Sequence, residues 1–105
     1  MENNDFIELE IDNNNNLVGL ECLNNDQLSK LREEHCIFIY KNTKTKKSFE
    51  GLCTTNFLDR HKENFNESNQ KFFSSSAFNK VIVVFTSFYE NPNFSFEKYN
   101  ELRSI

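Results

Sequence analysis

The feature that most constrains the fold is a pair of strand-like segments, residues 36–41 and 48–53, joined by a lysine-rich turn. In the first segment, CIFIYK, apolar side chains fall on both sides of the alternation, which is typical of a strand covered on both faces. The connecting residues 41–47, KNTKTKK, carry the positive charge, and Asn42 is a residue type that begins turns. The pattern predicts a strand and its partner strand.

The segment before residue 36 predicts two further strands and a helix. Residues 6–11 alternate between apolar and acidic side chains, as in a half-exposed strand. The short apolar run at residues 17–23 is expected to pair with it as a hairpin. Asn25 or Asp26 is expected to cap a short helix after that hairpin.

The segment after residue 53 predicts a helix, a strand and a second helix. Thr55 or Asn56 is expected to cap the first helix. Residues 81–85, VIVVF, are mostly β-branched and uncharged, which predicts a strand at the centre of its sheet. Asn93 or Ser95 is expected to cap the last helix.

These elements predict a small α+β domain with a central antiparallel or mixed sheet, flanked by helices and extended by an N-terminal strand pair. Residues 1–34 are assigned to the N-terminal strands and short helix, and residues 35–105 to the principal domain, within one compact unit. The net charge of -4 argues against coating nucleic acid through bulk electrostatics, so any such contact needs a local basic patch.

Two sequence features set the expected compartment. The apolar runs fall short of the roughly 18 residues of a membrane span, and the acidic start MENNDFIELE differs from a signal peptide. We therefore expect an intracellular protein of the cytoplasm or nucleus, without membrane contact.

Cys22, Cys36 and Cys53 are an odd number of cysteines without C-x-x-C spacing, so we expect reduced thiols. A zinc site that combines them with His35 or His61 is disfavoured, because the close-spaced ligand pairs of such sites are absent from the sequence.

From about residue 35 onward, the chain resembles the GIY-YIG nuclease domain. That family has a G-I-Y strand, a turn, a Y-I-G strand, a helix that opens with Asn-Leu-x-x-Arg, then a strand and a helix with a metal-binding glutamate. The corresponding positions here are Cys36-Ile37-Phe38, Phe49-Glu50-Gly51, Asn56-Phe57-Leu58-Asp59-Arg60 and Glu97 in FEKYNEL. The spacing between Gly51 and Asn56 is one residue longer than the usual pattern.

The resemblance implies phosphodiester cleavage by a tyrosine base, an arginine that neutralises the phosphate and a glutamate that holds Mg²⁺. Arg60 and Glu97 match the last two roles, whereas Phe38 and Phe49 stand at the positions of the family tyrosines. Phenylalanine keeps the packing but cannot transfer a proton. Tyr40 lies on the same strand face as Phe38 and would restore one hydroxyl in a shifted register.

The same residues also have structural interpretations. Arg60 can be an exposed helix residue paired with Glu63 or Glu97. Glu97 can be a first-turn glutamate favoured by the helix dipole. Tyr40 can be a core residue, and the lysine-rich turn can simply be solvated.

Three functions follow as hypotheses. The first is a degenerate GIY-YIG-like domain that acts by binding a nucleic acid or a protein partner rather than by catalysis, without a cofactor. Its expected nucleic-acid contacts are Lys41, Lys44, Lys46, Lys47 and Arg60. The second is an active Mg²⁺-dependent endonuclease with Tyr40, Arg60 and Glu97 as catalytic residues and Glu97 as the metal ligand. The third is an accessory subunit of a larger assembly, docked through its N-terminal strands.

Overall fold

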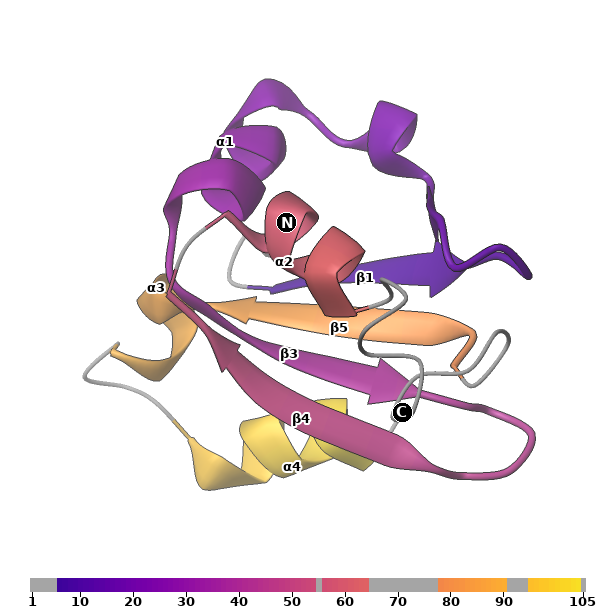
Figure 1. Ribbon diagram of the computed structural model, residues 1–105. Helices are drawn as coiled ribbons and strands as arrows, with labels where there is room; N and C mark the ends of the chain where they lie inside the picture. The colour runs from indigo at the N-terminus through magenta and orange to yellow at the C-terminus, as the bar shows by residue number, and fades with distance from the viewer. Residues whose placement is uncertain (1–5, 55, 65–77, 91–94, 105) are drawn as a thin grey trace.

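One five-stranded sheet organises the computed structural model, which describes residues 6–54, 56–64, 78–90 and 95–104 (Figure 1). The strand order is β2-β1-β5-β3-β4, and every neighbouring pair is antiparallel. The strands are β1 (Phe6–Ile11), β2 (Leu17–Val18), β3 (Cys36–Lys41), β4 (Ser48–Cys53) and β5 (Lys80–Phe85). The α+β prediction is confirmed, with an antiparallel rather than a mixed sheet.

Strand β5 lies in the middle of the sheet, as its β-branched composition predicted. Residues 81–85 are fully buried. Strand β1 pairs with one edge of β5 and strand β3 with the other, so the N-terminal strands extend the same sheet. The predicted alternation of β1 is confirmed, because Ile7, Leu9 and Ile11 are buried while Glu8 and Glu10 are exposed.

The N-terminal hairpin and helix differ in detail from the prediction. Strand β2 is only two residues long, because Gly19 adopts a φ of 96° and turns the chain into a 3₁₀ helix (Leu20–Cys22). Helix α1 (Asn25–Glu33) is capped by Asn24 rather than by Asn25 or Asp26. The Asn24 side chain accepts from the Gln27 amide at 2.8 Å, and Gln27 Oε1 accepts from the Asn24 amide at 3.0 Å. This reciprocal pair requires a Gln three residues after the cap, which only Asn24 has.

The later helices begin close to their expected caps. At α2 (Phe57–Asn64), Asn56 Oδ1 accepts from the Leu58 amide at 2.9 Å, and at α4 (Phe96–Ser104) Ser95 Oγ accepts from the Lys98 amide at 3.4 Å. The alternative caps Thr55 and Asn93 lie outside the described residues. The short helix α3 (Thr86–Tyr89), which follows β5 directly, was not expected from the sequence.

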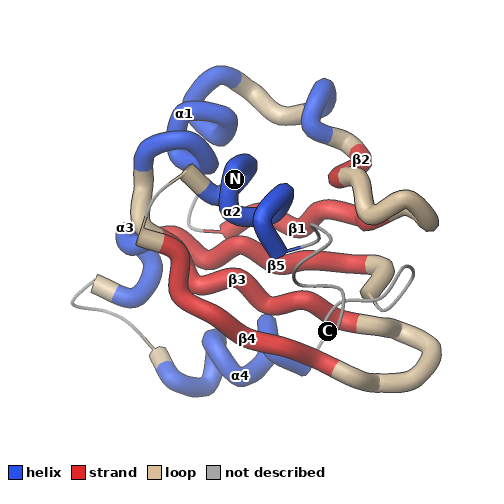
Figure 2. Tube along the Cα trace, viewed as in Figure 1, coloured by secondary structure: helices blue, strands red, loops and turns tan. Residues whose placement is uncertain are grey.

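The two faces of the sheet carry separate cores, and Figure 2 shows α1 and α2 on one side of the sheet and α4 on the other. Helices α1 and α2 cover one face, where Phe38 and Tyr40 pack with Phe57. Helix α4 covers the opposite face, where Ile39 packs with Leu102. We call these the α2 face and the α4 face. Both faces of β3 are therefore covered, as predicted, and the sheet separates side chains on α2 from those on α4.

The described helices are also short. None of those in residues 6–54, 56–64, 78–90 and 95–104 has the length and apolar character needed to cross a membrane.

Candidate functional site

The ring of Phe38 occupies the space above Gly51. The two residues are directly opposite in the β3–β4 ladder, and a Cβ added at Gly51 would lie 2.6 Å from Phe38 Cε2. Phe38 is 1% exposed, and its ring centroid lies 5.3 Å from that of Tyr40 and 6.0 Å from that of Phe57. The glycine of the second motif is therefore required by packing, and Phe38 is a core residue.

Tyr40 forms a buried polar pair with His61 of α2. Its hydroxyl lies 2.8 Å from His61 Nδ1, and His61 Nε2 lies 2.7 Å from the backbone carbonyl of Asn15. A carbonyl oxygen only accepts, so Nε2 carries the proton and the neutral ring accepts at Nδ1. The Tyr40 hydroxyl is therefore the donor. Burial lowers the pKa of His61, which favours this neutral form.

This arrangement bears directly on Tyr40 as a possible base. Its side chain has no exposed surface, and its hydroxyl is donated to His61. A catalytic base must reach the proton that it removes, directly or through one water. Tyr40 would have to leave both the core and its histidine partner to do so.

Arg60 and Glu97 lie on different layers of the molecule. The Arg60 side chain is 46% exposed on α2, and its Nη1 lies 3.7 Å from Glu63 Oε2. Glu97 lies in the first turn of α4, in a shallow depression shared with Asn100 and Glu101. Because the sheet lies between α2 and α4, the structure does not bring Arg60 and Glu97 into one site. Arg60 instead makes one of the two ion pairs considered in its structural interpretation.

The described residues also form a poor metal site. They contain no group of three or more His, Cys, Asp or Glu side chains that could hold an ion. Among the described residues that line the depression around Glu97, Glu101 is the one other carboxylate. The cysteines are free thiols, with Cys22 exposed and Cys36 and Cys53 buried. Burial raises the pKa of Cys36, which disfavours the thiolate that a metal would require.

The lysine-rich turn has a well-defined backbone. Asn42 Oδ1 accepts from the Lys44 amide at 2.9 Å and the Thr45 amide at 3.1 Å, and the Asn42 amide donates to the Lys47 carbonyl at 2.9 Å. Lys46 adopts the left-handed conformation, with a φ of 65°. The prediction that Asn42 starts this turn is confirmed.

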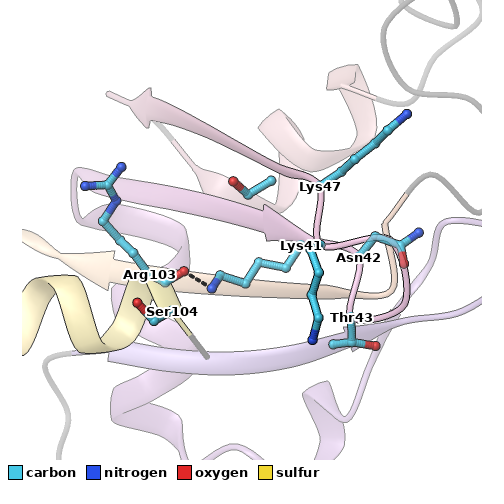
Figure 3. A pocket seen from close by; sticks show the side chains of 8 residues that line it. Lys41, Asn42, Thr43, Lys47, Arg103 and Ser104 are labelled. Carbon is cyan, nitrogen blue, oxygen red and sulfur yellow. Dashed lines mark hydrogen bonds between the residues drawn. The ribbon is translucent and has the colours of Figure 1, made fainter.

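A cavity of about 240 Å³ lies between this turn and the end of α4 (Figure 3). Its basic side chains are Lys41, Lys46, Lys47 and Arg103, and its hydroxyl groups belong to Thr43, Ser48 and Ser104. Arg103 also forms an ion pair with Glu50 of β4. Basic residues of β3, of the turn and of α4 therefore lie at one end of the sheet.

Lys41 differs from the other lysines of the turn. It is 7% exposed, and its ammonium donates to the backbone carbonyl of Arg103, at the end of α4. Burial, followed by the nearby charge of Lys80, lowers the pKa of Lys41. Lys41 thus stabilises the end of a helix, where carbonyls lack partners. Lys44, Lys46 and Lys47 are exposed at the surface.

Two residues of these clusters, Arg103 and His61, were not expected from the sequence. A basic residue in the last turn of a helix is ordinary dipole compensation, so nothing local marked Arg103 as a neighbour of the turn. His61 carried no signal of its contact with Tyr40 either, because that contact depends on how α2 packs on the sheet.

Searches of protein-family models, curated proteins and solved structures found no match to this chain. The GIY-YIG resemblance therefore rests on the motifs and the order of elements.

Proposed function

We propose that this chain is a binding domain that contacts nucleic-acid phosphates through the basic turn between β3 and β4. In this proposal it is a degenerate GIY-YIG-like domain without the cleavage chemistry of the family. The order β3, β4, α2, β5, α4 supports the resemblance. The observation that carries the binding function is the gathering of basic residues at this end of the sheet, where Lys46, Lys47 and Arg103 line one cavity although the Lys47 side chain points away from Arg103 (Figure 3).

The local charge favours a phosphate ligand although the whole chain is acidic. Two nearby carboxylates already form ion pairs: Glu50 pairs with Arg103, and Glu8 Oε1 lies 2.6 Å from Lys80 Nζ. Among the described residues, Lys46 and Lys47 take part in no ion pair. Exposed lysines on a fixed turn are suited to phosphate contacts, which position a nucleic acid without reading its sequence.

The endonuclease hypothesis has less support from the geometry. It needs the buried Tyr40 hydroxyl to leave His61, and it needs Glu97 to act from the opposite face of the sheet. We expect no cleavage of labelled DNA or RNA with Mg²⁺ or Mn²⁺. Cleavage that is lost in both Glu97→Ala and Tyr40→Phe would contradict the proposal.

The binding proposal is tested by charge reversal at the turn. The variant Lys46→Glu/Lys47→Glu should bind a labelled oligonucleotide more weakly in fluorescence anisotropy. For this variant, the magnitude of the slope of log K against log salt concentration should decrease by roughly 1.4 to 1.8, which corresponds to the loss of about two phosphate contacts.

The matched control is Lys62→Glu/Lys98→Glu, which changes the net charge equally at exposed positions of α2 and α4. It should keep the wild-type salt slope. If both double variants lose affinity and slope equally, net charge explains the binding and the turn is not the site.

A further inference from the structure

Phe49 presents a large aromatic side chain at the sheet edge, next to the basic turn. Phe49 is 44% exposed, whereas the strand aromatics Phe38, Tyr40 and Phe85 are buried. The rings of Phe49 and Phe38 are stacked, with centroids 6.4 Å apart and planes inclined by 25°. Phe49 is therefore supported from the core while much of its surface faces solvent.

Phe49 and Lys47 share one face of this edge. Phe49 is paired with Tyr40 in the ladder, which places it on the α2 face. Lys47 lies two residues earlier, where its carbonyl accepts from Asn42, so its side chain is on the same face about 7 Å along the strand. Figure 3 shows the Lys47 side chain pointing away from Arg103 and Ser104.

We propose that Phe49 stacks against an unpaired base while Lys46 and Lys47 contact the adjoining phosphates. The ligand class is then single-stranded nucleic acid. This inference rests on the proposed function and adds to it the recognition of bases. Aromatic platforms beside positive charge bind single strands in a way that tolerates any sequence, because every base has a π face.

The surroundings of Phe49 favour a single strand over a duplex. Base faces in a duplex are covered by their neighbours, so a ring platform requires bases that are free to unstack. In the part of the chain that the structure describes, β4 pairs with β3 alone, and the far side of β4 is the edge of the sheet. Because the Phe49 ring already packs against the Phe38 ring, base stacking should cost little side-chain conformational entropy.

The test compares three dye-labelled probes of equal length by fluorescence anisotropy: oligo(dT), an abasic oligonucleotide with the same phosphates, and a blunt duplex. Wild type should bind oligo(dT) at least about fivefold more tightly than the abasic strand, the lower end of one base–aromatic stack. Phe49→Leu should reduce oligo(dT) binding to the abasic level and leave abasic binding unchanged.

A second variant reports on stacking directly. The chain contains no tryptophan, so Phe49→Trp places a single tryptophan at the platform, whose fluorescence can be followed. Its fluorescence should be quenched by oligo(dT) and not by the abasic strand. The control Leu52→Ala removes another exposed apolar side chain of β4, on the opposite face, and should bind all probes like wild type.

The outcomes separate this inference from the proposed function. Equal wild-type binding of oligo(dT) and abasic strand, both weakened by Lys46→Glu/Lys47→Glu, overturns the stacking and leaves the phosphate contact standing. Tighter binding of the duplex also overturns it. If no probe binds, both proposals fail.

Discussion

Replacing Gly51 by alanine tests the packing that holds the central hairpin. The added Cβ would lie 2.6 Å from Phe38 Cε2 and 3.1 Å from Cε1, whereas carbon atoms in contact lie about 3.5–4.0 Å apart. The Phe38 ring is 1% exposed and enclosed by Tyr40, Phe49 and Phe57, so it cannot move aside without displacing other rings. We expect overpacking rather than adjustment.

The expected magnitude combines two opposing effects. Overpacking a close-packed core costs about 1–3 kcal/mol. Alanine in place of a strand glycine recovers about 0.5–1 kcal/mol of backbone entropy. The net destabilisation is therefore about 0–2.5 kcal/mol, with a midpoint slightly above 1 kcal/mol. For a domain of this size, the midpoint corresponds to a melting temperature lowered by roughly 5–10 °C.

Thermal unfolding followed by circular dichroism measures this loss, and a second background identifies its cause. In Phe38→Leu, the ring above Gly51 is gone, so adding Gly51→Ala should cost less than about 0.5 kcal/mol. Gly19→Ala is the control, because Gly19 has a φ of 96° and no atom within 4 Å of an added Cβ. Its cost is conformational and should be equal in both backgrounds. The steric argument would be refuted if Gly51→Ala cost the same in wild type and in Phe38→Leu, or if it stabilised the wild-type protein.

Two further predictions concern the buried Tyr40–His61 pair. Burial lowers the folded-state pKa of His61 below its ordinary value near 6.5, so the unfolded chain binds a proton that the native chain does not. In urea unfolding, the free energy of unfolding should be at its full value above pH 6.5 and should fall by at most about 1.4 kcal/mol per pH unit below pH 6.5. His61→Gln should remove this pH dependence. The control His35→Gln, at an exposed position, should keep it. Tyr40→Phe removes the hydroxyl that donates to His61 Nδ1, so it should lower the free energy of unfolding by about 1–3 kcal/mol and leave oligonucleotide affinity unchanged. Weaker binding with unchanged stability would instead place Tyr40 at the binding surface.

The strands were predictable because their signal is local. The alternating side chains of β1 and β3 indicate which faces of these strands are covered, and the β-branched run of β5 does the same. The burial of these strands in the structure follows that pattern. The true cap of α1 was also available from the sequence, since Asn24 and Gln27 have the spacing of a capping box.

The candidate site was less predictable, because it depends on which layer each helix occupies. The spacing of Tyr99 and Leu102 shows that α4 packs on something, but it does not show which face of the sheet α4 covers. That choice separates Glu97 from Arg60 and brings Arg103 to the lysine-rich turn. Pairing across a sheet can be inferred from strand patterns, whereas helix placement depends on contacts distant in sequence.

Phe38 and Phe49, which the GIY-YIG resemblance aligns with tyrosines, have different surroundings. Phe38 lies in a core where a hydroxyl would need a buried partner, so phenylalanine is explained there by packing alone. Phe49 is 44% exposed, and a hydroxyl at such a position could be solvated, so burial gives no reason for its absence. Packing on Phe38 accounts for the inner side of the Phe49 ring. The proposed base stacking would give the exposed part of this apolar ring a role in binding.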